Sequence, residues 1–124
     1  MTIEAETSLL ESVPTGLFVG GEWRSAASGR TFQVDDPATG SALADVADGG
    51  ADDAAAALDA AVEAAGSWAR TAPRIRSDIL RRTFDAVRAR ADEFALLMTL
   101  EMGKPLAEAA GEVTYGNEIG RAHV

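Results

Sequence analysis

Alanine is the feature that most limits what this chain can fold into, because it supplies 26 of the 58 apolar residues in a chain of 124. Only 32 larger apolar side chains remain to build a core. An alanine side chain removes little surface from water, and burial stabilises by only about 25 cal/mol per Å² of apolar area. We therefore expect a thin core, or one that needs a partner surface.

The chain is strongly acidic, with 20 Asp and Glu residues against 11 Lys and Arg, for a net charge of −9. This charge opposes phosphate backbones and anionic lipid headgroups, so nucleic acid and membranes are not expected as partners. The arginines over residues 74–90 are interleaved with acids, which favours a solvated helix face. No apolar run approaches the about 18 residues of a membrane helix, and residues 1–14 lack the pattern of a signal peptide. We expect a soluble, cytoplasmic protein.

The N-terminal third is predicted to be irregular and β. Residues 1–16 show no period and are expected to form a flexible arm. The pair Gly20-Gly21 lies between two short apolar stretches and predicts a hairpin, because glycine accepts the positive φ angles of a two-residue turn. A second strand pair is predicted on either side of a turn-forming sequence, over residues 31–34 and 42–46.

Four helices are predicted in the remainder, where apolar residues recur every three to four positions. They run from Asp52 to about Gly66, from Pro73 to Val87, from Phe94 to Met102 and from Leu106 to Glu118. Asp52 is the predicted N-cap of the first helix, and Gly103 suits the C-cap of the third. Leu58 and Val62 are expected on a buried face, and Trp68 is expected to follow the first helix and close the edge of the core.

Few residues could carry chemistry. The chain has no cysteine, which excludes a disulfide, a thiolate metal site and a cysteine nucleophile within these residues. His123 is the only histidine, so neither a Ser-His-Asp relay nor a multi-histidine metal site is expected. For Lys104, the only lysine, surface or capping duty is favoured over a catalytic amine. The acid pairs at 35–36 and 52–53 are expected to bond local backbone amides.

Several blocks resemble, in order and in spacing, the start of the NAD(P)-dependent aldehyde dehydrogenases. The blocks are residues 18–23, residues 36–40, Trp68, Arg76 with residues 79–81, and residues 97–109. The last block most resembles the succinate-semialdehyde dehydrogenase branch, and the resemblance covers about residues 17–118. Asp36 stands where the family usually has Asn before Pro-Ala-Thr-Gly, and Asp can make the same turn.

The resemblance implies an α/β fold in which this chain forms the N-terminal strands and helices of an incomplete, Rossmann-type cofactor domain. It implies that the full-length enzyme oxidises an aldehyde, succinate semialdehyde by its branch, to the carboxylic acid through a cysteine thioester, with NAD or NADP as cofactor. In the family the catalytic groups and the main dinucleotide contacts lie further along, so no catalytic or cofactor-binding residue is assigned here. The full-length enzyme is expected to be a homo-oligomer, and this chain alone to be inactive and loosely folded.

One site is implied within the chain. Some family members hold a monovalent cation with backbone oxygens just before the Asn-Pro turn and with an acid in the Gly-Lys-Pro helix. The matching positions are Val34, Asp35 and Glu101, and hard oxygen ligands suit such an ion. The alternative for Glu101 is a helix-capping or solvated role, which is the more frequent one for such a residue.

The tail, residues 119–124, resembles no continuation of the family and matches the translation of a common sequencing adapter. We therefore expect the last helix to break off after Glu118 and the tail to be an assembly artefact, which divides the chain into 1–16, 17–118 and 119–124. Two alternatives stay open. One is a stand-alone acidic module that binds another protein through its alanine-rich helices, and the other is a non-catalytic regulatory subunit.

Overall fold

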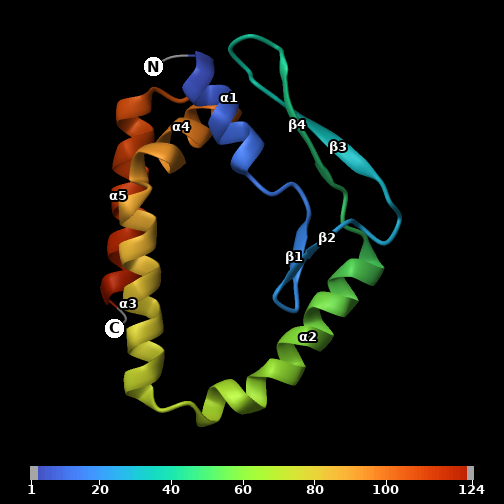
Figure 1. Cartoon of the computed structure of the whole chain (residues 1–124), viewed down its shortest axis with the longest axis vertical. Helices are drawn as coiled ribbons and strands as arrows, with labels where there is room; N and C mark the ends of the chain where they lie inside the picture. The colour runs from blue at the N-terminus through green and yellow to red at the C-terminus, as the bar shows by residue number, and fades with distance from the viewer. Residues whose placement is uncertain (1–2, 123–124) are drawn as a thin grey trace.

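The computed structural model describes residues 3–122, which form five helices and four strands (Figure 1). The strands are β1 Leu17–Val19, β2 Glu22–Arg24, β3 Thr31–Asp35 and β4 Ala42–Ala47. The helices are α1 Ile3–Ser12, α2 Ala51–Arg70, α3 Pro73–Ala89, α4 Ala91–Met102 and α5 Leu106–Ala122. The mixture of helix and strand agrees with the expected class. His123, for which no ligand role was expected, lies outside the described residues.

The first predicted hairpin is confirmed. Strands β1 and β2 pair antiparallel, with Phe18 opposite Trp23. Gly20 and Gly21 connect them with φ angles of 64° and 90°, which glycine adopts without strain. The rings of Phe18 and Trp23 stack at a tilt, with centroids 5.1 Å apart, and both remain largely exposed.

The second predicted strand pair is also confirmed, with β3 and β4 antiparallel and each one residue longer than expected. Asp36 organises the turn between them. Its Oδ1 accepts a hydrogen bond from the N–H of Ala38 at 2.8 Å, and its Oδ2 accepts one from the hydroxyl of Thr39 at 2.9 Å. An aspartate therefore makes the turn for which the family usually uses asparagine, as expected.

Helix α1 corrects the expectation of an irregular arm over residues 1–16, because residues 3–12 are helical. Leu9 is buried, and the Ser12 hydroxyl donates to the Leu9 carbonyl at 2.7 Å. α1 lies against α4 (Figure 1), so its order depends on a helix some 80 residues further along. A local apolar period could not reveal this, because tertiary packing supplies most of the stability of a short helix.

Helix α2 corrects two further expectations. Its N-cap is Gly50 instead of Asp52, because Asp53 at the third helical position accepts the Gly50 N–H at 3.0 Å. The helix also continues through Gly66 to Arg70, since a single glycine costs only about 1 kcal/mol in a helix interior. Trp68 is therefore part of the helix and 45% exposed, and does not close the core.

The last three helices begin and end largely as predicted. Pro73 opens α3, and Gly103 caps α4 with a left-handed φ of 69°. The expected break after Glu118 is wrong, since the backbone of α5 stays helical to Ala122. Arg121 and Ala122 both have high helix propensity, which favours this continuation. Among residues 3–122, no helix combines the length and the apolar content needed to cross a membrane.

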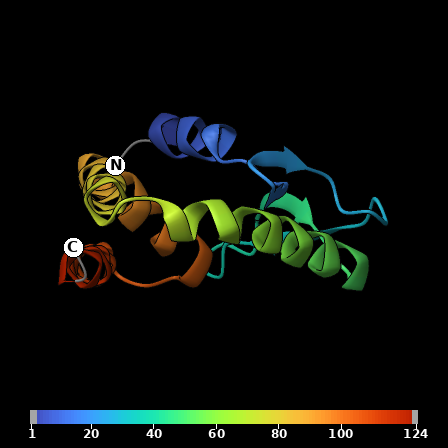
Figure 2. The same cartoon turned by 90° about the horizontal axis from the view of Figure 1, so that it is seen from below.

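The core lies where α4 meets α5 and is as thin as the alanine content predicts. Ala95, Ala109 and Val113 form its buried cluster, with Val87 and Met98 packed against it. Figure 2 shows α1 and α5 on opposite sides of this helical region, while α2 reaches from it toward the strands. Leu58 and Val62 of α2, expected to be buried, are 64% and 65% exposed, because no described element covers that face.

Candidate functional site

The three positions implied for a cation lie on two elements that meet at one contact. Val34 and Asp35 end strand β3, and Glu101 lies in the last turn of α4. The turn after β3 approaches the end of α4 so closely that a methyl group on Gly103 would lie 3.1 Å from Cγ of Pro37. Asp35 and Glu101 are each two residues from this contact. The fold thus brings together the two sequence blocks in which the resemblance places the site.

Two backbone features shape the surroundings of this contact. The strand register shifts between Val34 and Asp35, which interrupts the ladder at the two residues whose backbone oxygens are implicated. On the other side, the Gly103 N–H donates to the Thr99 carbonyl at 2.9 Å and closes α4.

The resemblance implies that backbone oxygens and one carboxylate would hold a monovalent ion here. The side chains of Asp35 and Glu101 are exposed, and neither makes a hydrogen bond or an ion pair within residues 4–117, whose side chains the structure describes. In that same part of the chain, no group of three or more His, Cys, Asp or Glu residues is placed to hold a metal. Backbone oxygens with one carboxylate fit a monovalent cation better than a transition metal.

Lys104 follows Gly103 directly and forms an ion pair with Glu112 of α5. Its side chain is only 21% exposed. The ammonium group therefore links the α4–α5 connection to α5, which agrees with a structural duty and not with a catalytic amine. This pairing also leaves the Glu101 carboxylate without a neutralising partner.

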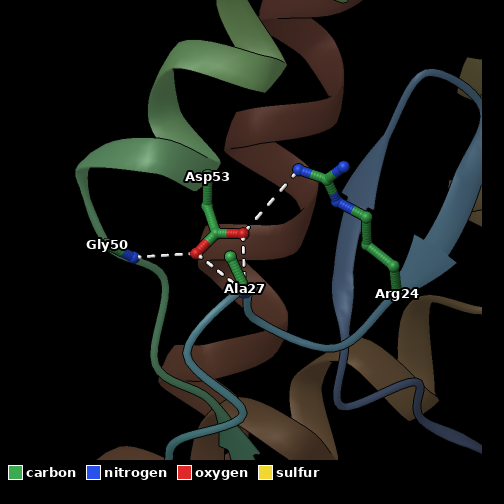
Figure 3. Close-up of polar contacts among 4 residues, drawn as sticks. All are labelled: Arg24, Ala27, Gly50 and Asp53. Carbon is green, nitrogen blue, oxygen red and sulfur yellow. Dashed lines mark hydrogen bonds and ion pairs between the residues drawn. The ribbon is translucent and has the colours of Figure 1, made fainter.

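A polar cluster around Asp53 ties α2 to the loop after β2 (Figure 3). The sequence predicted that the 52–53 acid pair bonds local backbone amides, but not that Asp53 contacts Ala27 and Arg24. The Asp53 carboxylate accepts the N–H of Ala27 at 3.0 Å and the N–H of Gly50 at 3.0 Å. Arg24 approaches it to 3.7 Å. The backbone hydrogen bonds from Gly50 and Ala27, and then the charge of Arg24, lower the pKa of Asp53 below its ordinary value.

The signal for this cluster was present in the sequence, since an acid three residues after a helix-capping position is typical of a capping box. Asp53 is 5% exposed, so it is shielded from substrate-sized molecules. The cluster therefore serves to hold the hairpin and α2 together. It confirms, for this acid pair, the expectation of bonding to local backbone amides.

An apolar groove of about 350 Å³ runs along the last three helices. Its lining includes Leu80, Phe84 and Val87 of α3, together with Phe94 of α4 and Val113 of α5. No cysteine or histidine borders it among the described residues, so the groove offers no nucleophile or general base of those types.

Comparison with known proteins gives a consistent result. The sequence profile described as the aldehyde dehydrogenase family matches residues 23–124. The succinate-semialdehyde dehydrogenase of Paenarthrobacter nicotinovorans is 66% identical over 77 residues, which is 62% of this chain and 17% of that protein. The Escherichia coli enzyme named succinate-semialdehyde dehydrogenase [NADP(+)] GabD is 44% identical over 97 residues, covering 78% of this chain and 20% of that protein.

A solved structure gives the same picture in three dimensions. The crystal structure of succinate-semialdehyde dehydrogenase from Burkholderia pseudomallei superposes with a TM-score of 0.83 and 45% identity, over 89% of this chain and 22% of that one. The chain thus spans about a fifth of the length of the relatives it matches.

Proposed function

This chain belongs to the aldehyde dehydrogenase family, and on that premise we propose that it forms the N-terminal part of an NAD- or NADP-dependent enzyme that oxidises succinate semialdehyde to its acid. The observation that carries the proposal is the 66% identity to a protein named succinate-semialdehyde dehydrogenase. Similarity to the B. pseudomallei structure, which bears the same name, supports it independently.

The chemistry proposed for the full-length enzyme begins with a cysteine thiolate, which attacks the aldehyde carbon. A thiolate is a competent nucleophile for this step, and the adduct it forms becomes a thioester only after it loses a hydride. Water then hydrolyses the thioester, which releases the carboxylic acid and the thiolate. The nicotinamide cofactor supplies the hydride acceptor when bound. The resemblance implies that in the family the catalytic groups and the main dinucleotide contacts lie further along than residue 118, so we assign the residues of this chain no catalytic step. Their proposed contribution is the scaffold, together with one ion site.

We propose that the ion site uses the backbone oxygens of Val34 and Asp35 and the carboxylate of Glu101 to hold sodium or potassium. The contact between Pro37 and Gly103, which brings the two elements together, supports this assignment. Glu101→Gln in the full-length enzyme should remove the dependence of activity on these ions, because it removes the one negative ligand. An unchanged dependence on both ions would contradict the assignment.

The proposal of activity is tested by extending the gene beyond residue 124 and assaying the longer product. We expect it to encode a cysteine-containing remainder and to show a higher kcat/KM for succinate semialdehyde than for betaine aldehyde. Parallel assays with NAD and NADP identify the cofactor. Turnover of aldehyde by the purified 124-residue chain alone would contradict the assignment of catalysis to the remainder.

The isolated chain is proposed to be inactive and loosely folded, since so many large apolar side chains lack a covering element. Examples that are 53% to 65% exposed are Leu58, Val62 and Ile75. These exposed residues are also what an interaction module or a regulatory subunit would use. Calorimetric titration with NAD and NADP, combined with capture by the full-length enzyme, distinguishes those alternatives from an inactive part.

Three further properties belong to the same proposal. The full-length enzyme is proposed to be cytoplasmic and a homo-oligomer, which fractionation and sedimentation of the longer product test. Residues 119–124 are proposed to derive from adapter sequence, on their match to its translation. A different codon series across these six positions in the nucleotide record would refute the adapter origin.

A further inference from the structure

We propose that the contact between Gly103 and Pro37 is a positioning joint that sets the distance between the Glu101 carboxylate and the backbone oxygens at the end of β3. This inference rests on the cation site proposed above and adds the residues that hold its two halves in register. Neither Gly103 nor Pro37 is itself a ligand in that proposal. Their role is to position those that are.

Each side of the joint is held by its own hydrogen bonds. On the strand side, the Gly40 N–H donates to the Asp36 carbonyl at 2.7 Å, and the Asp36 N–H donates to the Ser41 carbonyl at 2.9 Å. On the helix side, the Gly103 N–H donates to Thr99, and the following Lys104 is held by Glu112. Because both sides are braced, a displacement at the contact is transmitted to the residues next to it.

The space at the joint leaves little room for a side chain at position 103. A methyl group on Gly103 would lie 3.1 Å from Cγ of Pro37, which is tighter than an ordinary contact, but 3.8 Å from its Cβ, which is an ordinary one. An alanine at 103 therefore conflicts with the ring of Pro37 and not with its Cβ. The outcome should be a wider separation between Asp35 and Glu101.

Gly40 offers a matched control on the same turn. Its φ of 71° is nearly that of Gly103, so alanine at either position suffers the same left-handed strain. A methyl group on Gly40 would have nothing within 4 Å. Any effect of Gly103→Ala beyond that of Gly40→Ala is therefore due to the contact with Pro37.

The first experiment measures sodium binding by the full-length product directly, from the broadening of the ²³Na resonance and its reversal by potassium. Gly103→Ala should lose most of the broadening, while Gly40→Ala should keep it. Adding Pro37→Ala to Gly103→Ala should restore it, because the conflicting Cγ is gone. Equal losses of ²³Na broadening in Gly103→Ala and Gly40→Ala would contradict the positioning role of the Gly103–Pro37 contact. A double variant that does not recover the broadening would also contradict it. Absence of broadening in the unmodified full-length product overturns the cation site, and with it this role of the joint.

A second experiment tests the contact without any cation. Residues 1–124 contain no cysteine, so in a full-length product whose other cysteines are replaced by serine, the double variant Pro37→Cys, Gly103→Cys contains one pair. Its Cβ separation of 3.8 Å equals the mean for disulfides, which predicts rapid oxidation to a single cross-linked species. The control pair Gly40→Cys, Gly103→Cys should stay reduced under the same conditions. Similar cross-linking of both pairs would show that the contact does not exist in solution. Cross-linking of the first pair alone, without sodium binding, would confirm the contact and reject only its role toward the ion.

Discussion

The helical region of α3 to α5 and the long helix α2 differ in how they are held. Where α4 meets α5, Ala95 and Ala109 are almost fully inaccessible to solvent. In α2, every residue from 61 to 70 is exposed, and the helix makes its main strand contact with β1. Its start is fixed by the hydrogen bonds of Asp53. One region is therefore stabilised by apolar packing, and the other by a polar anchor at one end.

The largest effect should come from placing a charge in the packed region. Ala109→Asp puts a carboxylate at a position with 0% exposure and no partner, which should cost more than about 3 kcal/mol and unfold the helical region. Urea unfolding of the full-length product, followed by circular dichroism, measures the loss. The matched control is Ala110→Asp on the exposed side of α5. Equal stability of the two variants would show that apolar packing at Ala109 does not stabilise the helical region.

A substitution on the exposed face of α2 should have a large effect only when the rest of the enzyme is present. Leu58→Asp changes a side chain that is 64% exposed, so the isolated chain should lose no more than about 0.5 kcal/mol. In a chimera, with residues 23–118 replacing the matching part of the P. nicotinovorans enzyme, the same change should markedly lower the yield of active protein. This follows if the remainder of the enzyme covers α2. A chimera that tolerates Leu58→Asp as well as the exposed change Glu63→Asp would show that α2 stays uncovered.

The polar anchor should respond to substitution of Asp53. Asp53→Ala leaves the N–H groups of Ala27 and Gly50 without their acceptor, which should loosen the hairpin and increase amide hydrogen exchange there. Exchange in α4 and α5 should stay unchanged. Asp52→Ala on the neighbouring exposed position is the control. Faster exchange in α5 upon Asp53→Ala would show that the two regions are coupled.

The anchor should also respond to pH. The pKa of Asp53 is lowered from 3.8 by folding, chiefly through the bonds from Gly50 and Ala27. Its contribution to stability is therefore complete above the unfolded pKa and is lost as the pH falls through the lower folded pKa. Acid titration of hairpin amide signals should show a step that Asp53→Asn removes. A step that persists in that variant would assign the transition to other acids.

The smallest expected effect is a gain in stability from a substitution in α5. Gly111 lies inside α5, and a methyl group there would meet nothing within 4 Å. Gly111→Ala should thus stabilise the chain by about 0.5 to 1 kcal/mol through helix propensity. Thermal unfolding measures the gain. A lower melting temperature would indicate a contact on this face in solution.

Features that depend on neighbouring residues could be predicted from the sequence, whereas those that depend on distant ones could not. Gly20-Gly21 and Gly103 predict a hairpin turn and a helix end, because glycine accepts positive φ angles. Both predictions are confirmed. α1 was missed because it packs against α4, which lies far along the chain. The bond from the Ala27 N–H to Asp53 was missed for the same reason, since only the fold brings these residues together.

In the candidate site, too, the motif positions could be predicted from the sequence, whereas the contacts between distant residues could not. Motif positions suggested Val34, Asp35 and Glu101, but only the fold showed that the turn at Pro37 touches Gly103. The partner of Lys104 was equally invisible, because Glu112 is eight residues away and reached across a break between two helices. Sequence spacing indicated which blocks matter, and packing showed where they meet.

The two hairpins have a practical consequence for handling the chain. Each sheet has two strands, so within residues 3–122 every strand keeps one edge whose amide and carbonyl groups lack a neighbouring strand. Open edges of this kind accept strands from other molecules. Purified material should therefore associate progressively at high concentration, and a lysine introduced at Gln33 in the middle of β3 should delay this association.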